Sequence, residues 1–186
     1  SYNQAVALKP DYAAAHSNLG NTFKELGRLE EALASYNQAI ALNPDLAEAH
    51  SNLGNTLQKL GRLGEAEASF TQAIELKPNS AEYYYNLGNT LKELGKLDEA
   101  EASYTQAIAL KPDYAEVHSN LGITLKELGK RDAAEASFIQ AIALKPNSAE
   151  AHSNLGATLH ELARLDEAEA SYNQAITLKP DYAEAH

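Results

Sequence analysis

Apolar residues recur along this chain at the spacing of a helix, and the whole pattern repeats every 34 residues. In residues 97–110 they include Leu97, Ala100, Tyr104 and Ala107, in steps of three and four that form one helical stripe. The prolines carry the same period, because each lies 34 residues after the last, at Pro10, Pro44, Pro78, Pro112, Pro146 and Pro180. A fixed period of this size predicts a solenoid of stacked units.

Two helices are predicted in each unit. The first follows the proline at an Asp or Asn with Glu three residues later, as at Asp45 and Glu48, which is the spacing of a capping box. It ends before a glycine suited to a left-handed turn, whereas the fifth unit has Ala163 there and should be strained or turn differently. Each helix is roughly 13–14 residues long and too short to be stable alone. The predicted fold is therefore all-α, with antiparallel helix pairs stacked in one direction.

The units can be numbered from the alanine that opens each first helix. We expect residues 1–186 to form a single array, with complete units at 13–46, 47–80, 81–114, 115–148 and 149–182. Residues 1–12 match only the end of a unit, and residues 183–186 match only the start of one. Neither end has the atypical, polar character of a capping unit, so we expect a segment of a longer array.

A glycine lies in the middle of every predicted first helix, where it costs about 1 kcal/mol relative to alanine. The repetition of this cost predicts that helix backbones approach each other closely at Gly20, Gly54, Gly88, Gly122 and Gly156. Large aromatic residues are expected to fill the space between helices, at Tyr36, Phe70, Tyr104, Phe138 and Tyr172.

Composition and charge restrict the classes of molecule that we expect the chain to bind. The chain is 44% apolar and 22% charged, which is typical of a folded protein. Its net charge of −11 disfavours nucleic acid and anionic membrane surfaces, since phosphate binding requires clustered lysine and arginine. The sequence has no run of about 20 apolar residues, which is the length that spans a bilayer. The absence of cysteine excludes disulfides and thiolate metal sites but does not decide the compartment. We expect a cytoplasmic location.

Nothing in the sequence indicates catalysis. A phosphate-binding loop, a nucleophile elbow and an HExxH motif are all missing, so we expect neither an enzyme nor a cofactor. Histidines recur at the fourth position of four units, at His16, His50, His118 and His152. Stacked helices lie about 8–10 Å apart, whereas zinc holds imidazole nitrogens at about 2 Å, so we favour a packing role over a metal site.

The column pattern resembles the tetratricopeptide repeat. The third unit carries the residues typical of that family at Leu87, Gly88, Leu91, Ala100, Tyr104, Ala107 and Pro112. Two departures are the histidines at position 4, where the family commonly has Trp or Tyr, and Arg131 at position 17, which is usually aromatic or Leu. The resemblance implies a right-handed superhelix whose concave face, lined by the first helices, binds extended peptides.

A row of asparagines at position 6 is the main candidate site. Asparagine is unfavourable inside helices, so its recurrence needs a reason, and its amide can pair with any peptide bond. The chain also resembles the arrays of O-linked N-acetylglucosamine transferases, in which this row hydrogen-bonds peptide backbone. The predicted peptide-binding asparagines are Asn18, Asn52, Asn86, Asn120 and Asn154, extended at position 9 by Asn21, Asn55 and Asn89. The alternative is that these amides bond to neighbouring helices.

Tyrosine and lysine side chains complete the predicted site. Tyr83, Tyr84 and Tyr85 are particular to the third unit, and Tyr85 is expected either to anchor a partner in the groove or to pack between repeats. The recurrent groove cations are Lys92, Lys126 and Lys24. They do not complete the clamp of lysines and arginines that binds acidic chaperone tails, so no such ligand is expected.

The hypothesis that follows is a non-catalytic scaffold that binds an extended peptide or protein segment. One alternative is the substrate-recognition part of a larger enzyme, such as a glycosyltransferase. Another is end-to-end self-association, because exposed stacking surfaces can join head to tail without closing.

Overall fold

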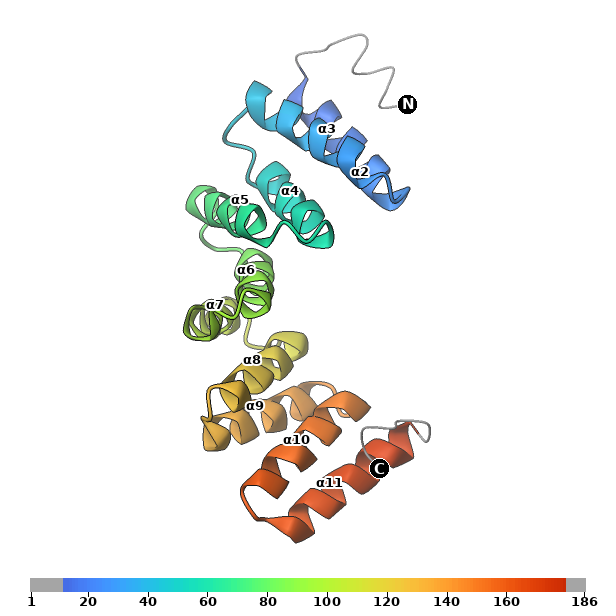
Figure 1. Cartoon of the computed structure of the whole chain (residues 1–186), viewed down its shortest axis with the longest axis vertical. Coiled ribbons are helices and arrows are strands. Elements are labelled where there is room, and N and C mark those ends of the chain that lie inside the picture. Colours follow the sequence, from blue (N-terminus) through green and yellow to red (C-terminus); the bar gives the residue numbers. More distant parts are fainter. Residues whose placement is uncertain (1–11, 180–186) are drawn as a thin grey trace. The chain divides into compact units, whose positions relative to one another are not determined.

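A computed structural model describes residues 12–179, which consist of ten helices and no strand. The chain divides into two compact units, residues 1–94, called the first unit, and residues 95–186, called the second unit. The 34-residue units of the sequence are called repeats from here on. The first unit holds α2 (Ala13–Glu25), α3 (Leu29–Leu42), α4 (Ala47–Lys59), α5 (Leu63–Leu76) and α6 (Ala81–Glu93) (Figure 1). The second holds α7 (Leu97–Leu110), α8 (Ala115–Glu127), α9 (Arg131–Leu144), α10 (Ala149–Glu161) and α11 (Leu165–Leu178). This is the all-α solenoid that the 34-residue period predicts.

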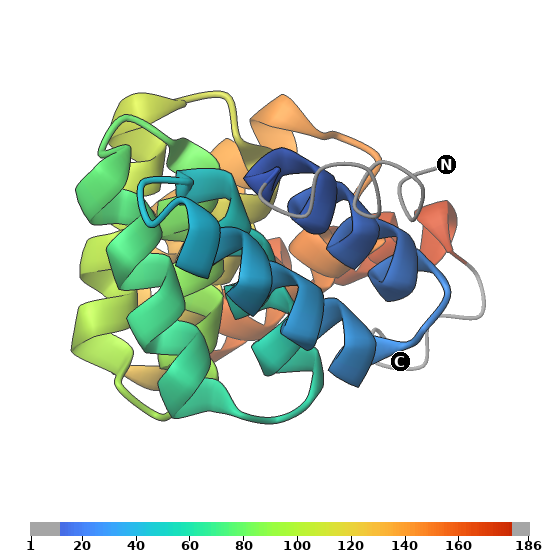
Figure 2. The ribbon, with the colours of Figure 1, turned by 90° about the horizontal axis from the view of Figure 1, so that it is seen from above.

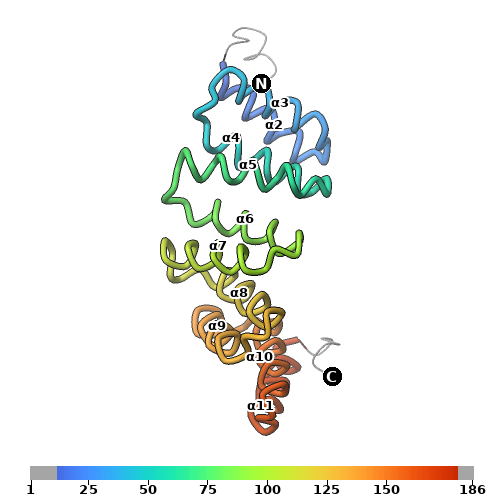
Figure 3. Tube along the Cα trace, turned by 60° about the vertical axis from the view of Figure 1, so that its left-hand side comes forward, coloured from blue at the N-terminus to red at the C-terminus, as the bar shows by residue number. Residues whose placement is uncertain are grey.

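Each unit is built by stacking helices in chain order. In the first unit α2 packs on α3, α3 on α4, α4 on α5 and α5 on α6, and the helices α2, α4 and α6 also touch in succession. Figure 2 shows α2 in dark blue alongside α3 in lighter blue. In the second unit the same order runs from α7 to α11, with α8 also touching α10. Short turns join the two helices of a pair, as the tube in Figure 3 shows for α8 and α9.

The mid-helix glycines make room for aromatic rings. A Cβ placed on Gly54 would lie 2.8 Å from Phe70 Cε1, and one on Gly122 would lie 2.7 Å from the same atom of Phe138. Both rings are fully buried. The sequence predicts that a second helix backbone lies close to these glycines, whereas in the structure an aromatic ring occupies that space.

A left-handed residue ends each first helix. Gly27, Gly61, Gly95 and Gly129 have φ between 72° and 75°, and Ala163 takes φ 59° in the equivalent place. The hydrogen bonds are those of a Schellman turn at both residue types, since Arg62 N–H donates to Leu57 O at 2.9 Å and Arg164 N–H to Leu159 O at 3.0 Å. Ala163 thus keeps the turn type and bears strain that glycine avoids.

The predicted capping boxes are wrong. Asp45 and Glu48 do not cap α4, because the helix begins at Ala47 with Leu46 as its N-cap and no side-chain cap bond. Asp45 instead belongs to the turn before the helix, where its N–H donates to Asn43 Oδ1 at 3.2 Å. Asn79, Asp113 and Asn147 lie in the same kind of turn.

Ion pairs between successive repeats explain one departure from the family pattern. Arg131, which replaces an apolar residue, pairs with Glu161 of the next repeat at 2.8 Å. Arg164 pairs with both Glu167 and Glu135 at 2.6 Å. Within residues 12–179, no helix combines the length and apolar character needed to cross a membrane.

Candidate functional site

The five asparagines of the predicted row lie one on each first helix, and all are half-buried. In the first unit they are carried by α2, α4 and α6, which touch one another, so Asn18, Asn52 and Asn86 follow a continuous layer of helices. In the second unit α8 and α10 carry Asn120 and Asn154 in the same way. The row thus faces solvent in part, as a ligand-contacting surface requires.

A threonine that sequence reasoning missed supports each of these asparagines. The hydroxyl one turn later donates to the asparagine's own backbone carbonyl, for example from Thr56 to Asn52 O at 2.8 Å and from Thr124 to Asn120 O at 2.9 Å. Four of these threonines are fully buried. The recurrence of Thr four residues after each asparagine is visible in the sequence, and in the structure each hydroxyl bonds to the backbone of its own helix.

The amide groups of the row are used unequally inside the chain. Asn52 Oδ1 accepts a hydrogen bond from Lys24 Nζ at 3.1 Å, which leaves its amide nitrogen as the group that can donate to a ligand. Asn120 also has a partner within the chain. The side chains of Asn18, Asn86 and Asn154 take part in none of the hydrogen bonds of the described residues. Bonding to neighbouring helices therefore does not explain the row as a whole.

Lys24 is more constrained than an ordinary surface lysine. Burial lowers the pKa of its ammonium, nearby Lys59 lowers it further, and Glu25 and Glu82 act in the opposite direction. The same position of later first helices holds Lys92 and Lys126, both half-buried. These lysines thus stand on the helices that carry the asparagine row, as predicted.

Two of the asparagines at position 9 have a partner within the chain. Asn21 Oδ1 accepts a hydrogen bond from the hydroxyl of Tyr36, whose ring is fully buried, at 2.7 Å. In the next repeat, which carries Asn55, the residue equivalent to Tyr36 is Phe70, which has no hydroxyl, and Asn89 has a partner within the chain. Half of the Asn21 amide is therefore committed to the core, which the sequence alone does not reveal.

The histidine row stabilises the loops that join repeats. The Nε2 atoms of His50, His118 and His152 lie 2.9–3.0 Å from the carbonyl oxygens of Pro44, Pro112 and Pro146. Because a carbonyl can only accept, each Nε2 donates. This contact supports the packing role that the sequence favours for these residues.

A polar pocket of about 220 Å³ lies beside the asparagine row in the first unit. It is lined by residues of α4, of α6 and of the loop between α5 and α6, namely Glu48, Ser51, Asn52, Lys77, Ser80, Glu82 and Tyr83. Burial raises the pKa of the Tyr83 phenol, and the charges of Glu48 and Glu82 raise it further. Tyr85, the tyrosine favoured by the sequence, is half-buried and has a partner within the chain. Tyr83 forms part of the polar pocket.

The second unit has the equivalent segments with different contacts. Lys145 Nζ lies 3.4 Å from Glu116 Oε1, and Ser148 Oγ accepts a hydrogen bond from Ala151 N at 3.2 Å. In the first unit, among the described residues, Lys77 and Glu48 form no such ion pair. Ser80 makes no cap bond to α6.

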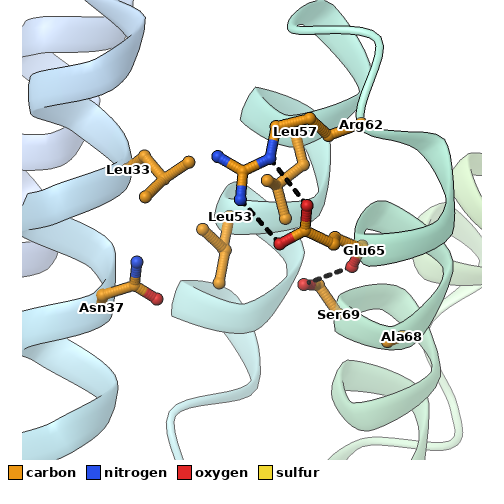
Figure 4. Close-up of a pocket in the computed structure, with 8 residues that line it drawn as sticks. All are labelled: Leu33, Asn37, Leu53, Leu57, Arg62, Glu65, Ala68 and Ser69. Atoms are coloured by element: carbon orange, nitrogen blue, oxygen red, sulfur yellow. Dashed lines mark hydrogen bonds and ion pairs between the residues drawn. The ribbon is translucent and has the colours of Figure 1, made fainter.

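A second pocket is lined mainly by residues of α3, α4 and α5. It has a volume of about 260 Å³ and lies between α3 and α5, beside Leu53 and Leu57 of α4 (Figure 4). Its polar groups are engaged with one another, because Arg62 makes two hydrogen bonds of 2.7 Å to Glu65. A similar apolar pocket of about 280 Å³ lies between α9, α10 and α11. These pockets offer few polar groups to a ligand.

Comparison with known proteins gives one family. Family profiles described as TPR repeat match residues 1–27, 20–61 and 88–129, and profiles described as tetratricopeptide repeat match residues 119–183, 47–80 and 69–102. A search of curated proteins found no significant match.

Solved structures agree with these profiles. The crystal structure of YrrB, described as a TPR protein with an unusual peptide-binding site, is 25% identical with a TM-score of 0.87. The match covers 100% of this chain and 95% of that one. The crystal structure of MamA is 25% identical with a TM-score of 0.84, covering 89% and 96%. PilF of Pseudomonas aeruginosa, at 21% identity, 95% and 80% coverage and a TM-score of 0.81, shares the fold. The chain belongs to the tetratricopeptide repeat family.

Proposed function

We propose that this chain is a non-catalytic scaffold that binds an extended peptide along its first helices. The fold and its structural relatives fit a protein-interaction scaffold. The observation that carries the finer proposal is the state of the asparagine row. Its members are half-buried, and the side chains of Asn18, Asn86 and Asn154 make no hydrogen bond within the described residues. Amides in that condition can pair with the backbone of a ligand.

The proposed mode of binding depends little on the ligand's side chains. Each amide has a donor and an acceptor, so an asparagine can bond the N–H or C=O of any peptide. YrrB, which shares this fold, is described as having a peptide-binding site, and this supports a peptide as the ligand class here. Lys92 and Lys126, on the same helices, would contact the ligand's acceptor groups.

The test is a peptide selection followed by a matched pair of variants. Random displayed 12-residue peptides are selected on the whole chain, and one selected peptide is measured by calorimetry. Replacing Asn18 and Asn86, which belong to the same compact unit, together with alanine should weaken it about tenfold or more, because two amide contacts are lost. The control replaces Asn37 and Asn173, which lie on the second helices α3 and α11. A selected peptide that both double variants bind equally well would refute the role of the row.

A further inference from the structure

Tyr83 lines the polar pocket, and it differs from the residues at the same position of the other repeats. Its counterparts in the described repeats are Ala15, Ala49, Val117 and Ala151, which are all buried and too small to present a polar group. Tyr83 is 5% exposed and lines the pocket, so its phenol oxygen belongs to a cavity wall. Its hydroxyl makes none of the hydrogen bonds of the described residues.

A second polar group in the pocket also lacks a partner. Ser51 is 4% exposed and lines the same cavity, yet its hydroxyl makes no hydrogen bond within residues 12–179. Among the described residues, every side-chain polar atom that is fully enclosed has a partner, so this unpaired hydroxyl must open to the cavity. Hydroxyls at such sites are normally paired. Ser51 and Tyr83 therefore mark a place where a ligand group can supply the missing hydrogen bonds.

The charge of the pocket indicates which group that is. Glu48 and Glu82 form no ion pair within the described residues, and each lies in the first turn of its helix. Lys77 can balance one of them. Lys24 of α2 is bonded to the uncharged Oδ1 of Asn52, and the charge of Glu82 also acts on its ammonium, so Lys24 offsets part of the charge of Glu82. Two carboxylates would repel an anionic ligand group. A cationic group, in contrast, can donate hydrogen bonds to carboxylate and hydroxyl oxygens in the same pocket.

We infer that this pocket binds a lysine or arginine side chain of the peptide that lies along the first helices. The inference rests on the proposed function, because Asn52 belongs both to the asparagine row and to the pocket wall. A residue whose backbone pairs with Asn52 would place its side chain in the cavity. Its cationic group would reach Glu48 and Glu82, with the ring of Tyr83 available for a cation–π contact.

The direct test uses n-butylguanidinium, which carries the arginine head group and no peptide bond. Added to the ¹⁵N-labelled whole chain, it should cause saturable amide shifts at Ser51, Asn52 and Tyr83. The equivalent residues of the second unit, Ser119, Asn120 and Ala151, should not respond. Butyrate, with the opposite charge, should shift neither set. Equal shifts at both places, or no saturable shift, would overturn the inference.

Variants then separate the pocket from its counterpart. Replacing both Glu48 and Glu82 with glutamine should weaken n-butylguanidinium binding about tenfold or more. The matched change of Glu116 and Glu150 should leave the affinity unchanged. Ala151→Tyr should produce new shifts in the second unit, and Tyr83→Ala should abolish those in the first. Because Ala stands at this position in three other repeats, the last change suits the fold. Unaltered binding after the Glu48 and Glu82 changes would overturn the assignment.

The peptide selection distinguishes this inference from the function on which it rests. If the whole chain selects peptides rich in lysine or arginine, and the chain altered at Glu48 and Glu82 does not, the inference is supported. Selected peptides without that preference would overturn the inference while leaving peptide binding intact. A chain that selects no peptides at all would refute the proposed function, and this use of the pocket with it.

Discussion

Residues 77–82 and 145–150 have the same sequence, Lys-Pro-Asn-Ser-Ala-Glu, in two repeats that belong to different compact units. They are followed by Tyr83 in one case and Ala151 in the other. Beside Ala151, the lysine forms an ion pair and the serine caps its helix. Beside Tyr83, neither contact forms, and a polar pocket lies there instead. The two identical segments thus make different contacts where the residue that follows them differs.

We attribute the difference to the size of Tyr83. Its phenol ring is far larger than the methyl group of Ala151, it is almost fully buried, and it lines the pocket together with Lys77 and Ser80. The loop residues Lys77 and Ser80 then do not make the contacts of Lys145 and Ser148. Residues common to the repeats therefore hold the fold, while a residue that departs from them determines what the surface offers.

The largest expected effect tests the part that the two units share. Phe70 and Phe138 are fully buried against Gly54 and Gly122, so each change to alanine removes a ring from a closely packed site. We expect Phe70→Ala and Phe138→Ala to lower the free energy of unfolding by about 3–5 kcal/mol each. Repeat proteins unfold locally, so the measurement is amide hydrogen exchange within each unit as well as urea unfolding. A much smaller effect in one unit would contradict a common scaffold.

The scaffold is predictable because its residues act within one repeat. The helix lengths and the glycine turn after Glu93 follow from spacing alone, whereas the rings that lie against Gly54 and Gly122 occupy places where the sequence predicts a helix backbone. The capping boxes fail because Asp45 has two possible uses, as a helix cap or as a turn residue after Pro44. The sequence cannot tell them apart, and the structure shows the turn.

The site is less predictable because it depends on contacts between repeats. The asparagine row is found from its repetition, and Lys92 and Lys126 lie on its helices as expected. The bond from Tyr36 to Asn21 and the pocket at Tyr83 escape sequence reasoning. The sequence favours Tyr85 over Tyr83, since periodicity gives the face of a helix but not the depth of a side chain or the space beside it.

The second prediction uses alkaline pH to compare the two units. Burial, with a smaller effect from Glu25, raises the pKa of Tyr36 to about 12, whereas an unfolded chain ionises tyrosine near 10. Because the pKa of Tyr36 is higher in the folded chain, its neutral phenol contributes in full to the free energy of unfolding below about pH 10. This contribution is at most about 2 kcal/mol, and it is lost as the pH rises towards 12. In the second unit, Tyr172 is less buried and has Ala157 where Tyr36 has Asn21, so its effect should be smaller.

Urea unfolding between pH 9 and pH 12, followed by circular dichroism, measures this loss. Tyr36→Phe should reduce the alkaline loss of stability more than Tyr172→Phe does, with tyrosine absorbance confirming which phenol ionises. An alkaline loss that is the same in the wild type and Tyr36→Phe would contradict the assignment.

The third prediction concerns strain that the second unit alone carries among the described turns. Ala163 has φ 59°, while Gly129 takes φ 75° in the preceding repeat and Gly61 takes φ 72° in the first unit. Ala163→Gly should raise the free energy of unfolding by about 1 kcal/mol, because glycine adopts this conformation without a Cβ penalty. Gly129→Ala should lower it by a similar amount. Thermal and urea unfolding measure both, and a destabilising Ala163→Gly would show that the turn is not strained.

The smallest expected effect tests whether Tyr83 causes the difference between residues 77–82 and residues 145–150. Lys145 and Glu116 are 60% and 54% exposed, so Lys145→Gln should cost about 0.5 kcal/mol or less, and Lys77→Gln should cost less still because no ion pair is lost. If Tyr83 is what keeps the first pair apart, Tyr83→Ala lets Lys77 and Glu48 form it. Lys77→Gln made in that background should then cost as much as Lys145→Gln. A double-mutant cycle at low salt measures this coupling, and zero coupling between Tyr83 and Lys77 would mean that another residue separates the two sites.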